Sequence, residues 1–389
     1  MNVRQAERLK NVPPSGTRSV HARAGILADQ GRSIIDLSVG QPDFPTPEYI
    51  KNAAKQALDS NMTGYPPAAG IEQLREEIAS DIFKTIGVSY ASDEIIVTTG
   101  VAQGIFASMM SFLESGDEIL LPDPGYNAYI STARLTGAVI RTYDLFEDNN
   151  FSINIEQLRG LINSRTKMLV LISPNNPVGS IIREDILEKI SDLLKGTDVL
   201  VLSDEIYSRI MYEDFRYKSV SAFPGMRERC IILNGFSKYY SMTGWRIGYI
   251  ASPKELTVPM LSMCSMTTAC TNSISQYAAV AALRNPSNDI CEGMRAELNR
   301  RCEYLYTELN KIKNISCLKP EGSFYIFLNI KKTGMTSEEF SFKLLEECGV
   351  AVVPGTVFGE NGKGYVRLSF ASSFEDIVET ASRINQWMQ

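Results

Sequence analysis

A lysine and an arginine stand close together in a stretch that is otherwise rich in glycine and aromatic residues. Lys238 follows Gly235 and Ser237, Arg246 comes eight residues later, and residues 236–250 hold no other charged side chain. A lysine amine desolvated near a second cation has a lowered pKa, so it can attack an aldehyde carbon and later act as a base. An arginine can bind a phosphate through two parallel hydrogen bonds. The pair therefore suits pyridoxal phosphate, which carries both groups, although a solvated surface lysine is the alternative interpretation.

The stretch 234–249 resembles the cofactor-lysine segment of class I aminotransferases, which are pyridoxal-phosphate enzymes of fold type I. Residues 241–248, Ser-Met-Thr-Gly-Trp-Arg-Ile-Gly, are similar to a signature of subgroup I-gamma, which includes aspartate, aromatic and broad-specificity members. The resemblance implies that Lys238 is the catalytic residue and binds the cofactor covalently, and that Arg246 binds the cofactor phosphate. It also implies an α/β fold: a large domain with a mostly parallel seven-stranded sheet between helices, plus a smaller α/β domain.

Asp204 directly follows the apolar run 199–203. Burying a carboxylate without a partner is costly, so Asp204 needs a partner such as a protonated pyridine nitrogen. A helix cap is the alternative interpretation. Residues 203–207 resemble the family's pyridine-nitrogen motif, which implies that Asp204 contacts this nitrogen and that Tyr207 contacts the phenolic oxygen of the ring.

The segment 175–179, Asn-Asn-Pro-Val-Gly, has the composition of a turn. It also resembles the family's Asn-Pro-Thr-Gly motif, although Val178 stands where threonine is usual. The resemblance implies that Asn176 contacts both the phenolic oxygen of the cofactor and the carboxylate of the substrate.

Residues 99–104 join an expected strand to an apolar helix. A helix N-terminus offers free N–H groups to a phosphate, although a glycine-containing turn alone is weak support. The resemblance implies that the amides of Val101 and Ala102 bind the cofactor phosphate opposite Arg246. It also places Tyr126 on the face of the pyridine ring, with a core tyrosine as the alternative.

Arg367 lies within an apolar, strand-like segment, where an arginine is rare unless it is paired. A carboxylate would satisfy it through two hydrogen bonds, and the segment resembles the family's substrate-carboxylate arginine. By the same resemblance, Gly40 reaches the substrate, and Tyr65 reaches the cofactor from a neighbouring subunit. We therefore expect a homodimer with shared active sites.

Apolar runs of strand length recur between helix-like stretches, and they are continuous rather than alternating with polar residues. This pattern predicts a mostly parallel sheet covered by helices on both faces. Ligands gather at the carboxyl ends of such strands, where the polar residues named above stand. Residues 46–48, Thr-Pro-Glu, predict a helix start with Thr46 as its N-cap. The expected strands are 94–99, 118–121, 139–143, 167–173, 198–203, 230–234 and 247–251.

A second, smaller domain is expected toward the C-terminus, where one long charged helix precedes short strands. The helix is expected at 289–311, and the strands at 323–330, 350–353 and 365–370. By resemblance, residues 1–45 form an N-terminal arm and part of the small domain, residues 46–285 form the large cofactor-binding domain, and residues 286–389 form the small C-terminal domain.

The composition limits the classes of function. The net charge of −6 gives no field for gathering nucleic acid, and no apolar run approaches the roughly twenty residues of a membrane helix. The charged N-terminus lacks a secretion signal, so we expect a cytoplasmic protein. The seven cysteines are scattered and His21 is the only histidine, so we expect no metal site.

The resemblance implies a ping-pong transamination between an L-amino acid and a 2-oxo acid such as 2-oxoglutarate. Lys238 moves the proton from the substrate Cα, Asp204 keeps the pyridine nitrogen protonated, and Arg367 with Asn176 holds the substrate carboxylate. A carbon–sulfur β-lyase on the same fold and a non-catalytic regulator are the alternatives. A nicotinamide dehydrogenase is disfavoured, because the chain has no Gly-x-Gly-x-x-Gly turn.

The sequence says less about the identity of the amino donor than about the reaction. Ala102 occupies a position where some aspartate-preferring relatives have a lysine, so we favour an aromatic or broad-specificity donor, with aspartate still possible. Arg18 is a candidate contact for an acidic side chain, and a plain surface arginine is the alternative.

Overall fold

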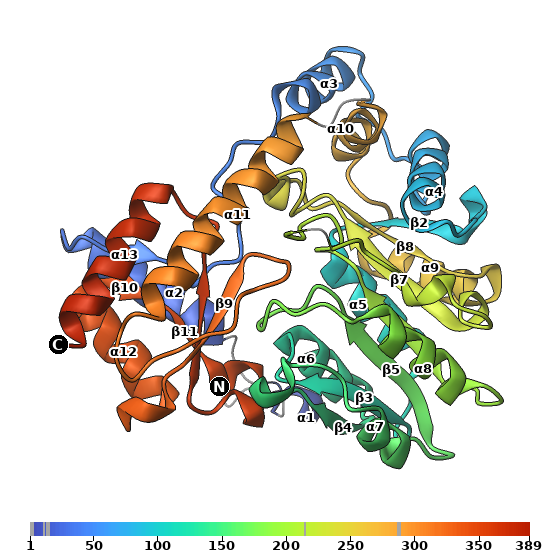
Figure 1. Cartoon of the computed structure of the whole chain (residues 1–389). Helices are drawn as coiled ribbons and strands as arrows, with labels where there is room; N and C mark the ends of the chain where they lie inside the picture. The colour runs from blue at the N-terminus through green and yellow to red at the C-terminus, as the bar shows by residue number, and fades with distance from the viewer. Residues whose placement is uncertain (1–3, 11, 13–15, 214, 286–288) are drawn as a thin grey trace.

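The computed structural model describes residues 4–10, 12, 16–213, 215–285 and 289–389. Its centre is a seven-stranded sheet with the order β2-β8-β7-β6-β5-β3-β4 (Figure 1). β8 runs antiparallel to both of its neighbours, whereas the other neighbouring pairs are parallel. The predicted mostly parallel sheet is confirmed, and each strand lies within two residues of its expected bounds: β2 (Ile95–Thr98), β3 (Glu118–Asp123), β4 (Val139–Asp144), β5 (Thr166–Ile172), β6 (Leu200–Asp204), β7 (Cys230–Gly235) and β8 (Gly248–Ala251).

Alternate residues of each strand enter two separate hydrophobic cores. In β5, Leu169 and Leu171 pack into the core with α7 (Ile155–Leu161) and α8 (Glu184–Leu194). Met168 and Val170 pack into the core on the opposite face. Each fully buried aliphatic side chain contributes about 1.5–3 kcal/mol, so both faces stabilise the sheet. The helices of the second core are α5 (Val101–Phe112), α6 (Asn127–Thr136) and α9 (Lys254–Thr268).

Three further helices pack together, and one of them, α4 (Glu72–Ile86), contacts β2. α10 (Ser273–Arg284) packs against α3 (Glu48–Asp59) and α4. Pro47 occupies the N-cap position of α3, and no side chain caps this helix. The prediction that Thr46 is the N-cap is therefore wrong. The Thr46 hydroxyl instead donates to the carbonyl of Ser241 at 2.6 Å, because the turn after β7 packs against this loop.

A smaller part of the molecule lies to the left in Figure 1. Its three-stranded antiparallel sheet has the order β11-β12-β9, and β10 pairs in parallel with β1 from the N-terminal segment. The expected strand at 350–353 is thus two short strands in different sheets. The elements are β1 (Ile35–Asp36), β9 (Tyr325–Asn329), β10 (Val350–Ala351), β11 (Val353–Pro354), β12 (Tyr365–Ser369), α2 (Gly16–Asp29), α11 (Asp289–Leu309), α12 (Ser337–Cys348) and α13 (Phe374–Trp387).

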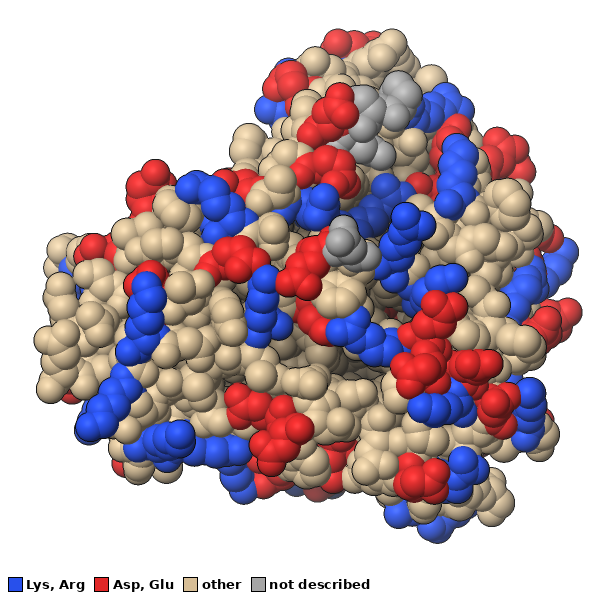
Figure 2. Space-filling model, viewed as in Figure 1, with Lys and Arg blue, Asp and Glu red and all other residues tan. Residues whose placement is uncertain are grey.

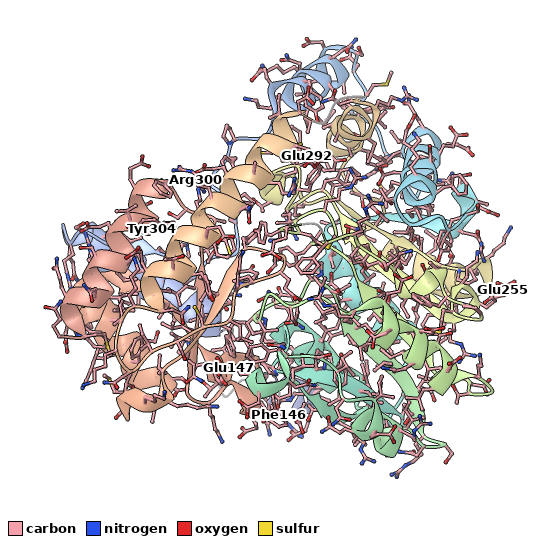
Figure 3. The ribbon with its side chains drawn as sticks, viewed as in Figure 1. Phe146, Glu147, Glu255, Glu292, Arg300 and Tyr304 are labelled. Carbon is pink, nitrogen blue, oxygen red and sulfur yellow. The ribbon has the colours of Figure 1, made fainter. Side chains whose placement is uncertain are left out.

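The long charged helix predicted near residue 289 is α11, which runs from α3 and α10 down into the smaller part (Figure 1). Arg300 and Tyr304, labelled on α11 in Figure 3, pack against Phe374 of α13. The guanidinium lies 3.5 Å from the Phe374 ring centroid, and the Tyr304 ring centroid lies 5.3 Å from it. The expected boundaries at residues 45 and 285 stay predictions, and residues 286–288 lie outside the described residues.

Several polar contacts join the two parts. The carboxylate of Asp123, the last residue of β3, accepts hydrogen bonds from the backbone N–H groups of Glu360 and Asn361, each at 3.1 Å. Glu147 lies at the same border (Figure 3) and accepts a hydrogen bond from the Tyr365 hydroxyl at 2.9 Å. These contacts hold β12 and the residues just before it against the carboxyl ends of β3 and β4.

Acidic and basic side chains are interspersed over the face shown in Figure 2. Within the described residues, no helix combines the length and apolarity needed to cross a membrane. The same residues contain no group of three or more His, Cys, Asp or Glu side chains arranged to hold a metal ion.

Candidate active site

A cavity of about 260 Å³ opens where the carboxyl ends of β5, β6 and β7 meet the start of α5 and the smaller sheet. Polar residues distant in sequence converge there, as expected for the edge of a parallel sheet. The predicted site residues that line it are Gly40, Val101, Ala102, Tyr126, Asn176, Asp204, Tyr207, Lys238, Arg246 and Arg367.

Lys238 lies in the turn after β7, and its amine faces into the cavity. Nζ donates a hydrogen bond to the carbonyl of Gly40 at 2.7 Å. The rings of Tyr207 and Phe324 flank this amine, with centroids 5.9 and 5.8 Å from Nζ. Burial, reinforced by the charges of two nearby arginines, lowers the pKa of Lys238 to about 8. About a tenth of the amine is therefore neutral and nucleophilic at pH 7, a far larger share than for a lysine of ordinary pKa.

The N-terminus of α5 forms one end of the cavity. Gly100 precedes the helix with φ of +74°, and a Cβ at this position would lie 2.7 Å from the guanidinium of Arg246. A Cβ at Gly248 would likewise lie 2.9 Å from the backbone nitrogen of Val101. Both glycines thus permit close approach of the chain, which places Arg246 beside the N–H groups of Val101 and Ala102. These groups belong to the first turn of the helix, so they have no acceptor within it. This arrangement suits an anion such as a phosphate.

Asp204 ends β6 and is only 4% exposed. Its carboxylate accepts hydrogen bonds from the Tyr129 hydroxyl at 2.7 Å and from the backbone N–H of Ile206 at 3.2 Å. Burial raises the pKa of Asp204, and these two neutral donors oppose that shift together with the Lys238 charge. A cation in the cavity would keep this carboxylate ionised.

Arg367 lies in β12 at the opposite side of the cavity and is 2% exposed. Its guanidinium donates hydrogen bonds to the Asn176 side-chain oxygen at 3.0 Å and to the Ser38 carbonyl at 2.6 Å. The rings of Tyr325 and Phe358 lie on it, with centroids 4.3 and 4.8 Å away. Its buried Nε has no hydrogen-bond partner among the described residues. An unpaired donor in such a buried cation is costly unless an anionic ligand reaches it.

The remaining predicted residues are aromatic. Tyr126 packs edge-on against Tyr129, with ring centroids 6.3 Å apart. The Tyr207 hydroxyl forms a hydrogen bond with the Tyr325 hydroxyl at 2.9 Å. Of the predicted site residues, all of which the structure describes, Tyr65 does not line the cavity, and it is 95% exposed. Folding of a single chain therefore does not bring Tyr65 to the site.

Comparison with known proteins identifies the family of this chain. The family model for aminotransferase class I and II matches residues 32–384. The chain belongs to this family. Its members use pyridoxal phosphate, so the protein is a pyridoxal-phosphate-dependent aminotransferase acting on amino acid and oxo acid substrates. This result favours transamination over the β-lyase and regulator alternatives.

The aminotransferase is 38% identical over 383 residues to an aspartate aminotransferase of Pyrococcus abyssi, covering 98% of this chain and 97% of the relative. It is 37% identical over 383 residues to aromatic-amino-acid aminotransferase 2 of Thermococcus litoralis, with the same coverage. The structure of Thermus thermophilus aspartate aminotransferase with maleate matches with a TM-score of 0.95 and 35% identity, covering 99% of this chain and 100% of that one.

The residues of this aminotransferase that were not predicted from the sequence include Tyr129, which donates a hydrogen bond to Asp204, and Tyr325, which lines the cavity. Tyr129 lies in the first turn of α6, three residues after the N-cap residue Tyr126, and this spacing is the signal that could have suggested a shared environment. Tyr325 carries no comparable signal, because it reads as one more aromatic residue in a buried strand. Arg18, whose role was left open, lines the cavity together with Thr17.

Proposed function

We propose that the cavity binds pyridoxal phosphate and that the enzyme transfers the amino group of an L-amino acid to a 2-oxo acid such as 2-oxoglutarate. The observation that carries this proposal is that one cavity holds both a lysine amine with a pKa of about 8 and a buried arginine whose Nε has no partner in the described part of the chain. The first group suits an aldehyde, and the second suits a carboxylate.

The residues present fit this cofactor. The N–H groups of Val101 and Ala102, with Arg246, would hold the phosphate, and the buried Asp204 carboxylate would hold the protonated ring nitrogen. The Tyr207 hydroxyl and the Asn176 amide would contact the ring oxygen, while Tyr126 would cover one ring face. When bound, the cofactor supplies an electrophilic carbon and a ring that accepts electrons from the substrate Cα.

The chain's own residues perform the positioning and the proton transfer. Arg367 binds the substrate carboxylate and thereby orients the Cα–H bond. The neutral Lys238 amine accepts the Cα proton at Nζ and then donates it. The lowered pKa of Lys238 permits both steps near neutral pH. Asp204 stays ionised opposite the ring cation. The rings of Tyr325 and Phe358 exclude water from the guanidinium.

The favoured donor is an aromatic amino acid or a broad set of amino acids. Ala102 lines the cavity with an uncharged side chain, so this position offers no cation to an acidic donor. Aspartate is the second candidate, because Arg18 lines the same cavity and could pair with a distal carboxylate. Among similar proteins, some are named aspartate and others aromatic aminotransferases, so both donors need direct testing.

The test uses purified enzyme loaded with cofactor and single amino acids, without an acceptor. We expect the absorbance band of the bound cofactor to convert to that of its aminated form, fastest with the true donor. The Lys238→Ala variant should bind cofactor but convert it to the aminated form far more slowly than the wild-type enzyme does. Absence of conversion with every common amino acid would count against transamination, and release of ammonia and pyruvate from cystathionine would favour the β-lyase.

We also propose a homodimer with shared sites. Tyr65 is 95% exposed, and a hollow of about 740 Å³ lies beside Arg246, open to an incoming side chain. Mixing subunits tests this arrangement. A dimer of one Lys238→Ala chain and one Tyr65→Ala chain would contain one intact site and one doubly altered site, so activity should return on mixing. No recovery in verified mixed dimers would argue against sharing.

A further inference from the structure

Tyr325, the first residue of β9, lies where three parts of the active site meet. Its hydroxyl is 2.9 Å from the Tyr207 hydroxyl. Its ring lies against the Arg367 guanidinium, with the centroid 4.3 Å from Cζ. A Cβ added to Gly40 would lie 2.0 Å from the Tyr325 hydroxyl oxygen, so that oxygen is fixed against the backbone of Gly40. Tyr325 is 2% exposed, and its position is therefore set by packing.

The hydroxyl groups of Tyr207 and Tyr325 carry one hydrogen each. Each tyrosine hydroxyl donates one hydrogen bond and can accept others. If Tyr207 donates to the cofactor ring oxygen, as the proposed function has it, its hydrogen is no longer available to Tyr325. The bond between the two tyrosines must then be donated by Tyr325. A hydroxyl group that accepts one hydrogen bond becomes a stronger donor of another, because the chain of bonds is polarised.

We propose that Tyr325 is a positioning residue that acts on the cofactor through Tyr207. By donating to Tyr207, it turns the Tyr207 hydrogen toward the cofactor ring oxygen and strengthens that bond, which stabilises the anionic form of the oxygen. The inference rests on the proposed function. It gives β9 of the smaller sheet a role at the cofactor ring in addition to its contact with the substrate-binding arginine.

The test is a pH titration of the cofactor absorbance in the holoenzyme and in Tyr325→Phe, which keeps the ring and removes the hydroxyl. Loss of the donor should raise the midpoint of the titration by roughly 0.5–1 pH unit, because the anionic ring oxygen is less stabilised. Tyr365→Phe is the matched control. This variant removes another tyrosine hydroxyl of the same sheet, one that donates to Glu147 outside the cavity (Figure 3), and should leave the midpoint unchanged.

A second arm uses the Tyr207→Phe background. Adding Tyr325→Phe there should shift the midpoint no further, since the hydroxyl through which Tyr325 acts is already absent. An unchanged midpoint in Tyr325→Phe, or equal shifts with and without the Tyr207 hydroxyl, would overturn the inference alone. Failure of the wild-type chain to bind cofactor would overturn the proposed function, and the inference with it.

Discussion

Replacing Arg367 with lysine tests whether this residue holds the substrate carboxylate. The guanidinium donates to Asn176 and to Ser38, and its Nε has no partner among the described residues. Lysine keeps the charge but has a single nitrogen. It therefore cannot donate to Asn176 and Ser38 and also bind a carboxylate in the planar geometry of arginine. Loss of one charge-assisted hydrogen bond costs about 1.5–3 kcal/mol. The expected loss in kcat/KM is therefore roughly 10- to 150-fold.

The measurement compares an amino acid with the corresponding amine that lacks the carboxylate, each in the half-reaction followed by cofactor absorbance. The loss in Arg367→Lys should appear with the amino acid and not with the amine. Arg367→Gln, which also removes the charge, should be more severe and should raise the pKa of Lys238, because the Arg367 charge helps to lower it. Arg301→Lys is the matched control, since Arg301 is 5% exposed and pairs with Asp43 away from the cavity.

Two results would refute this reasoning. The first is an Arg367→Lys enzyme whose kcat/KM for the amino acid stays within about twofold of wild type, well below the loss expected for one charge-assisted hydrogen bond. The second is an equal loss with the amine, which would mean that Arg367 supports the fold of the cavity rather than the substrate.

Three other predictions follow from the site. In the cofactor-free protein, the rate of cofactor capture should rise with pH and level off above about pH 8, because the Lys238 amine is protonated below its lowered pKa; a rate that keeps rising toward the ordinary lysine pKa would contradict this. Asp204→Asn should lower kcat by roughly 100-fold or more, since the amide cannot balance a ring cation; stopped-flow absorbance would show the loss. Gly40→Ala should reduce the free energy of unfolding by about 1–3 kcal/mol in urea titrations, because its Cβ would lie 2.0 Å from Tyr325, whereas Gly25→Ala, with open space around it, should not destabilise.

Much of the large sheet could be predicted because its signal is local. Continuous apolar runs mark strands buried on both faces, and each strand of that sheet was found within two residues of its expected bounds. The smaller sheet was predicted less well. The apolar segment 350–353 reads as one strand, but its first two residues pair with β1 and its last residue pairs with β12. Strand pairing depends on partners far away in the chain, so such a division leaves no local mark.

The sequence by itself determined which residues could do chemistry. Lys238, Asp204 and Arg367 stand out because a charged group in an apolar segment needs a partner, and folding brings all three to one cavity. Only the tertiary structure decided what supports them. The Arg367 guanidinium bonds to the Ser38 carbonyl across 329 residues, and Tyr325 reaches Tyr207 across 118. A tyrosine in a buried strand looks like any core residue, and its hydroxyl acquires a role only when the fold brings another hydroxyl within hydrogen-bonding distance.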